Sequence, residues 1–468
     1  MDMKKFLFIF LVACSLTACR EADSVIRVKT PARPAGQQDA IQLTAEPIDT
    51  VHIGIIGLGM RGIGAVKVLA NIPTAKVVAL CDLDSAKVER GQERLIKYGR
   101  PRAEGYWEDE NAWKKLCERP DVDLVVVITD WEKHAMMAKY AMECGKHTAI
   151  EVPAAMNLEE IWSLVNTCER TRRHCMMLEN CCYDFFELTT LNMAQHGLFG
   201  EIVHAEGAYI HDLDPFWDKF TENWRLRYNS THKGDVYPTH GLGPVCQALN
   251  IHRGDRFKTL SAMETKPFSG PGKMKAVAGT DCPDFQNADL TMTMISTEKG
   301  RTILVEHDVM TPRPYSRMYQ LVGTDGYASK YPVQQYAFRP EKLGPEAADI
   351  ENLSAHKAVP DEVRDAMMEQ YRSPILTPEL EAMAKTVGGH GGMDFTMYYR
   401  LIYCLNHGLP LDMDVYDLAE WCCLAELGSI SIAHGGAAVE VPDFTRGAWN
   451  KLNGYAHAKA PEDCVNHE

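Results

Sequence analysis

The stretch Val51-His52-Ile53-Gly54-Ile55-Ile56-Gly57-Leu58-Gly59-Met60-Arg61-Gly62 decides the fold of this chain. Its first half is apolar and strand-like, and its second half has the spacing G-x-G-x-x-G and leads into a helical pattern. A second apolar run over 77–81 ends at Asp82, twenty residues after Gly62. This order of strand, glycine motif, helix and strand predicts a βαβ unit that binds a dinucleotide.

Each glycine of this motif has a distinct task. Gly57 permits the tight turn, Gly59 lets the backbone approach a pyrophosphate, and Gly62 lets helix and strand pack closely. The pyrophosphate is expected at the N-terminus of the helix, where free N–H groups and the helix dipole favour an anion. Asp82 is expected to accept hydrogen bonds from the adenosine ribose and to repel a 2′-phosphate, so the predicted cofactor is NAD(H) rather than NADP(H).

Length and composition indicate a globular protein of two or three domains. The chain has 468 residues, of which 46% are hydrophobic and 24% charged. Its formal net charge of −15 argues against binding to nucleic acid, because a phosphate backbone requires clustered Lys and Arg. No segment beyond the N-terminus has the ~18 or more uninterrupted apolar residues of a membrane span.

The N-terminus has the pattern of an export signal. Lys4 and Lys5 precede the apolar run 6–13, which is too short to span a bilayer but suits the core of a signal peptide. The following Leu16-Thr17-Ala18-Cys19 resembles a bacterial lipobox, whose cysteine is lipidated and becomes the mature N-terminus. We therefore expect a signal peptide over 1–19, lipidation of Cys19, and an exported lipoprotein tethered to a membrane, in the periplasm or at the cell surface.

Two alternatives stay open for this segment. Leu11-Val12-Ala13-Cys14 also fits the lipobox pattern, with a shorter apolar core, and an ordinary secretory signal would leave both cysteines incidental. Residues 20–50 contain several Pro, Gly and Gln residues and few large apolar groups, which predicts an extended tether between the lipid and the first domain.

The first domain is predicted over 51–180, where strand and helix patterns alternate. This alternation is typical of a doubly wound parallel sheet, here an NAD-binding Rossmann domain. Strands are expected at 51–56, 76–81, 124–128, 147–150 and 175–178, and helices near 61–71, 85–98, 109–118, 132–144 and 157–173.

The second domain is predicted over 181–450, where strand patterns follow one another without intervening helices. They lie near 202–209, 258–263, 288–296, 301–308 and 317–322, and helices are expected near 184–196, 377–386, 393–407 and 414–434. The pattern predicts an α+β substrate-binding domain with a mainly antiparallel sheet, followed by a tail over 451–468.

Candidate site residues follow the strands of the first domain, because ligands bind at the carboxyl ends of such strands. Trp131 and His134 come after the strand 124–128 and are placed to flank the nicotinamide ribose. The alternative is a helix capped by Asp130 with a surface aromatic beside it. Glu151-Val152-Pro153 and Glu179-Asn180 follow the next two strands and are positioned in the same way.

The second domain offers a phenol and an imidazole close together in Tyr237-Pro238-Thr239-His240-Gly241. Histidine is the side chain most easily tuned to exchange protons near neutral pH, although such residues are also often structural. Asn223-Trp224-Arg225 and Thr311-Pro312-Arg313-Pro314-Tyr315 are weaker candidates for binding a sugar. No metal site is expected, since the chain has no CxxC pair and no Cys/His cluster of zinc-finger spacing, and the cysteines are interpreted as buried thiols.

The two-domain plan, the GLGMRG motif and an acid-x-proline after a late strand resemble the glucose–fructose oxidoreductase/inositol dehydrogenase superfamily. That superfamily usually has Glu-Lys-Pro at this point, where the lysine assists proton movement at the reacting hydroxyl. This chain has Glu151-Val152-Pro153. Because valine moves no proton, the substitution argues against an ordinary dehydrogenase mechanism.

A closer resemblance is to glycoside hydrolase family 109, whose characterised members are NAD-dependent α-N-acetylgalactosaminidases. It runs from about residue 31 to the 444–449 stretch and rests on Glu151-Val152-Pro153-Ala154-Ala155, Leu178-Glu179-Asn180-Cys181-Cys182-Tyr183, Gly207-Ala208-Tyr209-Ile210-His211-Asp212-Leu213, Tyr237-Pro238-Thr239-His240-Gly241 and Arg313-Pro314-Tyr315-Ser316.

The resemblance implies a role for each matched residue. NAD would contact Met60, Arg61, Asp82, Trp131 to His134, Glu151, Val152 and Asn180. The sugar would contact Tyr209, Arg225, Tyr237, Pro238, Thr239, His240 and Tyr315. Proton transfer and orientation would fall to Glu179, Tyr209, His240 and Tyr315.

The implied reaction cleaves terminal α-linked N-acetylgalactosamine from glycans by oxidation, elimination, addition and reduction. It has no net redox change, so one tightly bound NAD+ serves many turnovers. Two other functions stay open: an NAD-dependent sugar oxidoreductase of the same superfamily, and a lipid-tethered glycan-binding protein in which NAD is structural. The sequence fixes neither the natural glycan nor whether the chain forms a homo-oligomer.

Overall fold

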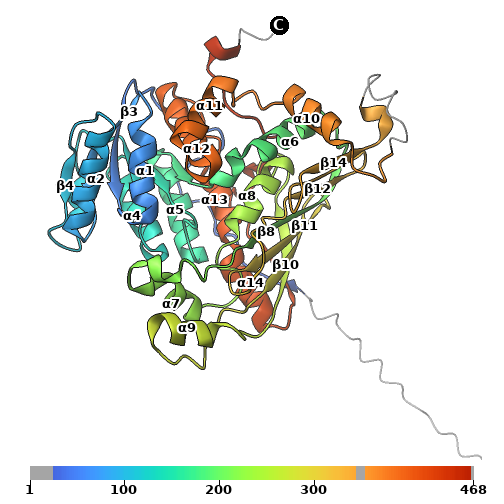
Figure 1. Ribbon diagram of the computed structural model, residues 1–468, viewed down its shortest axis with the longest axis horizontal. Coiled ribbons are helices and arrows are strands. Elements are labelled where there is room, and N and C mark those ends of the chain that lie inside the picture. Colours follow the sequence, from blue (N-terminus) through green and yellow to red (C-terminus); the bar gives the residue numbers. More distant parts are fainter. Residues whose placement is uncertain (1–24, 344–353, 465–468) are drawn as a thin grey trace, which may run out of the picture.

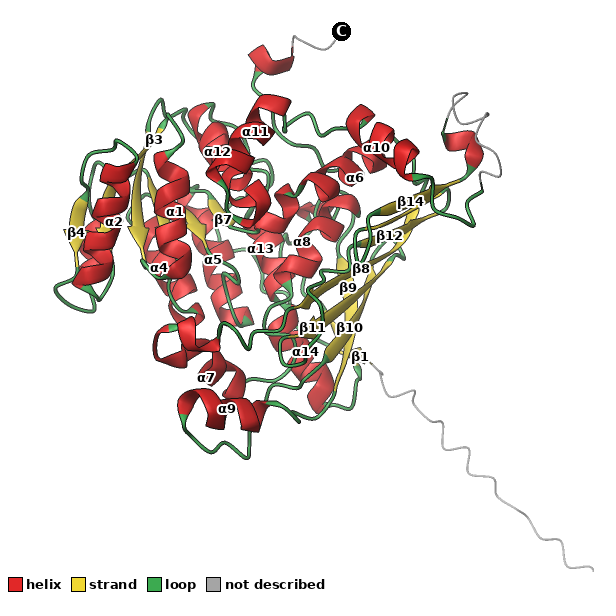
Figure 2. Cartoon of the chain, in the orientation of Figure 1, coloured by secondary structure: helices red, strands yellow, loops and turns green. Residues whose placement is uncertain are grey.

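The computed structural model describes residues 25–343 and 354–464 of the chain. Two β-sheets lie on opposite sides of the molecule, and the helices α6, α8 and α13 lie between them (Figure 1). Figure 2 shows the same two layers of strands with helices packed between and around them. The export signal and Cys19 lie outside the described residues.

The first sheet is parallel and has six strands in the order β4-β3-β2-β5-β6-β7. Its strands are largely apolar and buried, as expected for a sheet covered on both faces, except for the edge strand β4, whose residues are exposed or partly buried. They are β2 (Val51–Ile56), β3 (Ala75–Cys81), β4 (Glu104–Tyr106), β5 (Leu124–Val127), β6 (His147–Ile150) and β7 (Cys175–Met177). The connecting helices are α1 (Met60–Ala70), α2 (Ser85–Lys97), α3 (Ala112–Cys117), α4 (Trp131–Glu143) and α5 (Leu158–Thr171).

The second sheet has nine strands in the order β1-β15-β9-β10-β11-β8-β12-β13-β14. Most neighbours are antiparallel, while β8–β11 and β1–β15 are parallel pairs. The strands are β1 (Val25–Ile26), β8 (Ile202–Ile210), β9 (Phe257–Glu264), β10 (Thr291–Thr297), β11 (Thr302–Asp308), β12 (Gln320–Gly323), β13 (Gly326–Ser329), β14 (Gln335–Phe338) and β15 (Ala438–Glu440). The predicted fold class, a Rossmann domain followed by a mainly antiparallel α+β domain, is confirmed.

One helix predicted for the second domain is divided in two, and four of the described helices are missing from the prediction. The helix expected over 414–434 is two helices, α13 (Val415–Cys422) and α14 (Leu424–Ala433), which meet at Cys423. The others are α6 (Phe185–Gln195), α7 (Trp224–Thr231), α8 (Thr239–Ala248), α9 (Gly270–Ala278), α10 (Asp361–Gln370), α11 (Pro378–Val387) and α12 (Met393–Asn406). Helices α7, α8, α9 and α10 are missing from the prediction. Helix α8 was missed because its glycines and its internal Pro244 are typical of a loop.

Glycines bring α8 unusually close to strand β8. A Cβ atom on Gly207 would lie 2.1 Å from the carbonyl oxygen of Gly241, and one on Gly241 would lie 2.5 Å from the backbone nitrogen of Ala208. A Cβ on Gly243, two residues further along α8, would lie 2.8 Å from the Sγ of Cys182. The helix therefore packs backbone to backbone against the strand, and this fixes where its first turn lies.

The segment 25–50 differs from the expected extended tether, since it packs along the body of the protein. Its β1 adds a parallel strand beside β15, and Ala40 and Leu43 are buried. Arg33 donates to the buried carboxylate of Glu169 at 3.1 Å and to the backbone oxygen of Thr445 at 2.8 Å. A few apolar groups and one buried ion pair thus hold a segment whose composition alone suggests a linker.

The expected C-terminal tail is also folded onto the body as far as residue 464. Tyr455 and Ala460 are buried, and the amide of Gln247 donates to the Tyr455 hydroxyl at 3.1 Å. The described cysteines are free thiols, nearly all of them buried. Among the described helices, none has the length and apolar character needed to cross a membrane.

Candidate functional site

One large cleft runs from the glycine motif of the first domain to the inner face of the second. Its volume is about 1370 Å³. Most of the predicted site residues line it: Gly57, Gly59, Met60, Arg61, Asp82, Trp131, His134, Glu151, Val152, Asn180, Tyr209, Arg225, Tyr237, His240 and Tyr315. The predicted cofactor site and the predicted sugar site are therefore two ends of one cavity.

The glycine motif has the shape that a dinucleotide requires. Gly57 has φ +93°, and a Cβ there would lie 2.1 Å from the carbonyl oxygen of Ile128. A Cβ on Gly62 would lie 2.0 Å from the carbonyl oxygen of Gly57, whereas at Gly59 the space is open. No side chain caps the N-terminus of α1, so its first N–H groups are available to an anion.

Asp82 lies at the carboxyl end of β3, where a ribose is expected. Its Oδ2 accepts the backbone N–H of Leu58 at 2.8 Å, and its Oδ1 accepts that of Asp84 at 3.0 Å. These bonds hold the carboxylate beside the glycine turn, with Lys87 at 3.6 Å. Together with the open space at Gly59, this arrangement fits NAD.

A second polar group forms around Arg61, on the first turn of α1. Its guanidinium lies 3.4 Å from Glu151 and 2.9 Å from Asp394, and Asn180 donates to Asp394 at 2.7 Å. Burial alone would raise the pKa of Asp394, but His390 and Arg61 hold that pKa below its usual range. Three predicted cofactor residues are thus connected: Arg61 contacts Glu151 directly, and the carboxylate of Asp394 from α12 links Arg61 to Asn180.

Trp131 and His134 differ in what they offer the cleft. Trp131 is packed edge-on against Trp224 at 5.1 Å and Tyr228 at 5.2 Å. His134 is fully buried, with Nδ1 2.8 Å from the carbonyl oxygen of Pro153 and Nε2 3.1 Å from that of Thr129. Both ring nitrogens are engaged, so His134 fixes the loops after β5 and β6 relative to each other and has no nitrogen free for a ligand.

The imidazole of His240 forms the chemical centre of the cleft. Its Nδ1 lies 2.7 and 2.9 Å from the two carboxylate oxygens of Glu179, which is fully buried behind it. Burial would raise the pKa of Glu179, but the charge and hydrogen bond of His240 hold this pKa below its usual value. The carboxylate accepts the Nδ1 proton and thereby leaves Nε2 for proton exchange, 3.4 Å from the Tyr237 hydroxyl.

Cys181 adds a thiol to this pair. One ligand atom each from Glu179, Cys181 and His240 lies within 4.8 Å of the others, a spacing that also suits a metal ion, which the sequence did not lead us to expect. Burial raises the pKa of the Cys181 thiol well above its usual value. With His240 Nδ1 already bonded to Glu179, the arrangement is that of a hydrogen-bonded dyad with a neutral thiol beside it.

Arg225 lies in a box of aromatic rings at the sugar end of the cleft. Its guanidinium carbon is 4.6 Å from the ring centre of Tyr237, 5.0 Å from that of Trp131 and 5.7 Å from that of Tyr209. The residue is 7% exposed, and its Nε is buried without a hydrogen-bond partner. Among the described residues no carboxylate pairs with it, so this buried cation has donors to spare for a ligand.

The remaining predicted residues divide into two groups. Tyr315 is 42% exposed and lies edge-on to His211 at 5.2 Å. Gly62, Glu179, Pro238 and Thr239 do not line the cleft. Pro238 and Thr239 are buried at the start of α8, where they position the neighbouring Tyr237 and His240.

Among the polar residues that line the cleft and that sequence reasoning missed are His211, His390 and Asp394. His390 belongs to Gly388-Gly389-His390-Gly391-Gly392, whose four glycines all have positive φ, and its Nδ1 lies 2.9 Å from Asp394. A histidine flanked by glycines on both sides can indicate a functional residue in the sequence, because it is the one side chain of an otherwise glycine loop. His211 stands in a stretch that carried the family resemblance, but nothing in its spacing marks it.

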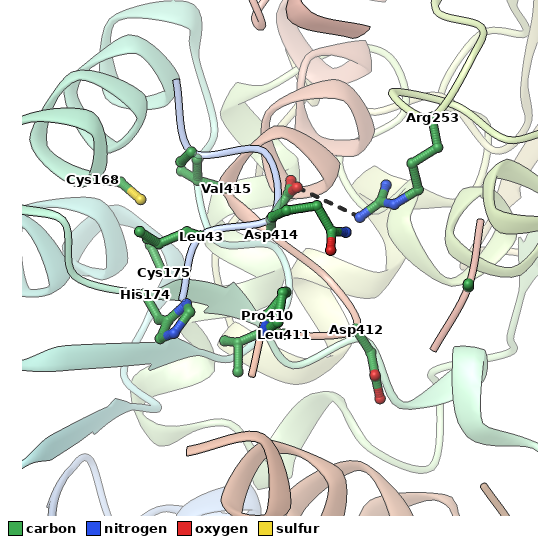
Figure 3. Close-up of a pocket in the computed structure, with 13 residues that line it drawn as sticks. Leu43, Cys168, His174, Cys175, Arg253, Pro410, Leu411, Asp412, Asp414 and Val415 are labelled. Carbon is green, nitrogen blue, oxygen red and sulfur yellow. Dashed lines mark ion pairs between the residues drawn. The ribbon is translucent and has the colours of Figure 1, made fainter. Parts of the chain in front are cut away.

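A second, small cavity lies away from the cleft, where the 25–50 segment meets α5, β7 and the loop before α13 (Figure 3). Its volume is about 20 Å³, enough for a single water molecule. Arg253 and Asp414 form an ion pair across 3.5 Å at its wall. It is too small for a cofactor or a sugar, so the large cleft is the candidate site.

Replacement of Asp82 tests the cofactor end of the cleft. In Asp82→Asn, the lost charge removes a strong ribose contact and the repulsion of a 2′-phosphate, so the preference for NAD+ over NADP+ should fall about tenfold or more. Calorimetric titration with both dinucleotides measures it. Asp123→Asn is a matched control, since Asp123 also accepts a backbone N–H, at the opposite end of the sheet. An unchanged preference in Asp82→Asn would contradict the assignment.

Comparison with known protein families matches both domains. The family described as Glycosyl hydrolase 109, C-terminal domain, matches residues 183–451. The family described as Oxidoreductase family, NAD-binding Rossmann fold, matches residues 51–179. The first domain is therefore an NAD-binding Rossmann domain.

Solved structures share the fold at low sequence identity. An NAD binding oxidoreductase from Klebsiella pneumoniae superposes with a TM-score of 0.62 at 18% identity, covering 84% of this chain and 100% of the other. Levoglucosan dehydrogenase in complex with NADH has a TM-score of 0.60 at 18% identity, with the same coverage. At this identity the likeness establishes the fold alone.

Relatives over the whole chain are much more similar. Glycosyl hydrolase family 109 protein 1 of Bacteroides thetaiotaomicron is 59% identical over 467 residues, which cover 98% of this chain and 100% of that protein. The Glycosyl hydrolase family 109 protein of Porphyromonas gingivalis is 61% identical over 436 residues, 93% of each chain. The chain therefore belongs to glycosyl hydrolase family 109.

Proposed function

We propose that this glycoside hydrolase cleaves terminal α-linked N-acetylgalactosamine from glycans with the help of a resident NAD+. The observation that carries the proposal is the His240–Glu179 dyad, which faces the same cleft as the NAD cradle. Val152, buried at the point where dehydrogenases of this fold have a lysine, supplies no proton there. The proton-accepting imidazole thus belongs to the second domain, and Glu179 of the first domain orients it.

The residues of the first domain fit the cofactor. The N-terminus of α1 would hold the pyrophosphate, Asp82 the adenosine ribose, and the group formed by Arg61, Glu151 and Asn180 would border the nicotinamide half. When bound, NAD+ supplies a reversible hydride acceptor for C3 of the sugar. A tightly held cofactor suits an exported enzyme, because free NAD is scarce outside the cytoplasm.

His240 is the proton acceptor that the geometry favours. Glu179 accepts the Nδ1 hydrogen and orients the imidazole, so Nε2 takes the hydroxyl proton of the sugar and returns it later. Glu179 itself is fully buried, touches no ligand and acts as a positioning residue.

A second base is needed at C2 of the sugar. A carbonyl at C3 acidifies the C2 proton, and its removal expels the C1 substituent by elimination, after which water adds at C1. Tyr209, Tyr237 and Tyr315 are phenols that line this part of the cleft. The partly exposed Tyr315 is the better placed for the reaction, whereas Tyr209 is buried against Tyr237 at 4.4 Å between ring centres and shapes the site.

Arg225 is the residue to which we assign binding of the N-acetyl group. Its buried, unpartnered donors favour a strong acceptor oxygen, and the acetamido carbonyl is the strongest neutral acceptor of the proposed sugar. The surrounding rings of Trp131, Tyr209 and Tyr237 exclude water and offer an apolar surface to the acetyl methyl group.

Turnover in D2O tests the proposed reaction. With an aryl α-N-acetylgalactosaminide, the enzyme should release many equivalents of aryl alcohol without accumulating NADH, and the sugar should carry deuterium at C2. His240→Ala should lower kcat by about a hundredfold or more, the scale of a lost acid–base group. Mass spectrometry and absorbance at the NADH band measure these results.

The other outcomes of this experiment identify other functions. NADH formed in proportion to converted sugar would indicate a sugar oxidoreductase. Release of aryl alcohol without deuterium at C2 would indicate direct displacement. Binding without cleavage of any glycoside would leave a glycan-binding protein.

Replacement of Arg225 tests recognition of the acetamido group. Arg225→Met keeps the apolar stem and removes the donors, so the ratio of kcat/KM for the N-acetylgalactosaminide over the matching α-galactoside should fall about tenfold or more. Arg227→Met, on the same helix, removes a guanidinium that bonds only the backbone oxygen of Glu222 and should leave the ratio unchanged. An unchanged ratio in Arg225→Met would assign the acetamido group to other residues.

We also propose that the enzyme is a lipoprotein anchored through Cys19 in the periplasm or at the cell surface, since the lipobox pattern ends at this residue. Cys19→Ser should move the protein from the membrane fraction to the soluble fraction and abolish incorporation of labelled palmitate. Cys14→Ser is the control and should change neither. Membrane association that survives in Cys19→Ser but is lost in Cys14→Ser would transfer the assignment to Cys14.

A further inference from the structure

A buried ionic cluster lies directly behind Tyr315. It consists of two acids from the start of α6, Asp184 and Glu187, and two bases from the second sheet, Arg317 and Lys330. Glu187 accepts from Arg317 at 2.6 Å and from Lys330 at 2.8 Å, and Lys330 also lies 2.7 Å from Asp184. The side chains of Arg317 and Glu187 are 3% and 2% exposed.

Arg317 connects this cluster to the cleft. Its Nη1 donates to the Tyr315 hydroxyl at 3.3 Å, and its guanidinium carbon lies 5.9 Å from the Tyr315 ring centre and 5.6 Å from that of Tyr331. The guanidinium therefore contacts both the hydroxyl of the proposed base and a buried carboxylate.

The backbone holds Arg317 in place at a conformational cost. The two following residues, Met318 and Tyr319, have φ +54° and +49°, which bulky residues rarely adopt. The carbonyl oxygen of Arg317 accepts the N–H of Ala208 at 2.8 Å, beside Tyr209 on β8. The fold thus keeps a strained loop where it presents this guanidinium to Tyr315.

The charges of the cluster act on Tyr315. Burial raises the pKa of the Tyr315 phenol, while the positive charge of Arg317 opposes the rise. Burial and the neighbouring Asp184 raise the pKa of Glu187 to about 7. The other titratable groups around Tyr315 or Glu187 include Cys181, Tyr209, Tyr319, Tyr336, Tyr331 and Lys330, together with His211, whose ring centre lies 5.2 Å from that of Tyr315.

We propose that Arg317, anchored by Glu187, is a positioning residue that orients the Tyr315 hydroxyl and stabilises negative charge on it during proton transfer. The inference rests on the proposed function, in which Tyr315 exchanges the C2 proton. It assigns the ionic cluster a role in the reaction beyond holding α6 against the sheet.

The test compares pH profiles of kcat. In Arg317→Met the limb that belongs to Tyr315 should move upward by about one pH unit or more, with kcat lowered about tenfold and KM near the wild-type value. Arg317→Lys keeps the positive charge but loses the planar guanidinium, so its Tyr315 limb should lie between those of the wild type and Arg317→Met. Glu187→Gln removes the opposing negative charge and should move the same limb downward.

Arg400→Met provides a matched control. Arg400, on α12, is an equally buried arginine that lies outside the cleft and pairs with Asp412 at 2.7 Å. Its loss should lower thermal stability and leave the pH profile of kcat unchanged. A purely structural role for Arg317 predicts the same behaviour for Arg317→Met as for Arg400→Met. Shifts of one sign in both Arg317→Met and Glu187→Gln would also overturn the proposal.

A direct titration separates this inference from the proposed function. Protein labelled with [ζ-13C]tyrosine, with Tyr315 assigned through Tyr315→Phe, reports ionisation of the phenol by NMR without any substrate. A wild-type enzyme that cleaves no glycoside would refute the proposed function alone. A Tyr315 resonance that titrates identically in wild type, Arg317→Lys and Glu187→Gln would refute the inference alone.

Discussion

The backbone contact between Gly207 on β8 and Gly241 on α8 is the constraint on which the site depends. It brings the first turn of α8 against the sheet and so sets His240 beside Tyr209 and over Glu179, a residue of the first domain. A side chain at either glycine would collide with the facing backbone and push α8 away from β8, which would stretch the hydrogen bond between His240 and Glu179. The backbone contact between α8 and β8 therefore positions the dyad, and the surrounding side chains shape the cleft.

The sequence predicts those parts of the site whose partners are close along the chain. The glycine motif and Asp82 act within one βαβ unit, so their spacing is informative, and the apolar strands follow from burial on both faces. Asp394 and His390 escape prediction because their partner Arg61 lies more than three hundred residues away. Helix α8 was missed because the glycines that permit its close packing also lower its helix propensity.

Dehydrogenases and this hydrolase share one scaffold, and the difference lies in where the proton-transfer groups are attached. The strand ends of the Rossmann domain carry the parts that hold a dinucleotide, and the apolar side chain at position 152 can transfer no proton. The second domain supplies the imidazole of His240 from α8, the guanidinium of Arg225 from α7, and phenols from β8 and from the loops before α8 and β12. Such a division lets the cofactor site stay constant while the chemistry changes with the facing domain.

The attachment of the 25–50 segment to the body has a geometric consequence for the whole enzyme. Strand β1 begins at Val25, six residues after Cys19, and six residues span at most about 20 Å. Under the proposed lipidation of Cys19, the edge of the nine-stranded sheet would therefore lie close to the lipid surface. The local density and orientation of glycans at that surface would then matter more to the enzyme than their bulk concentration.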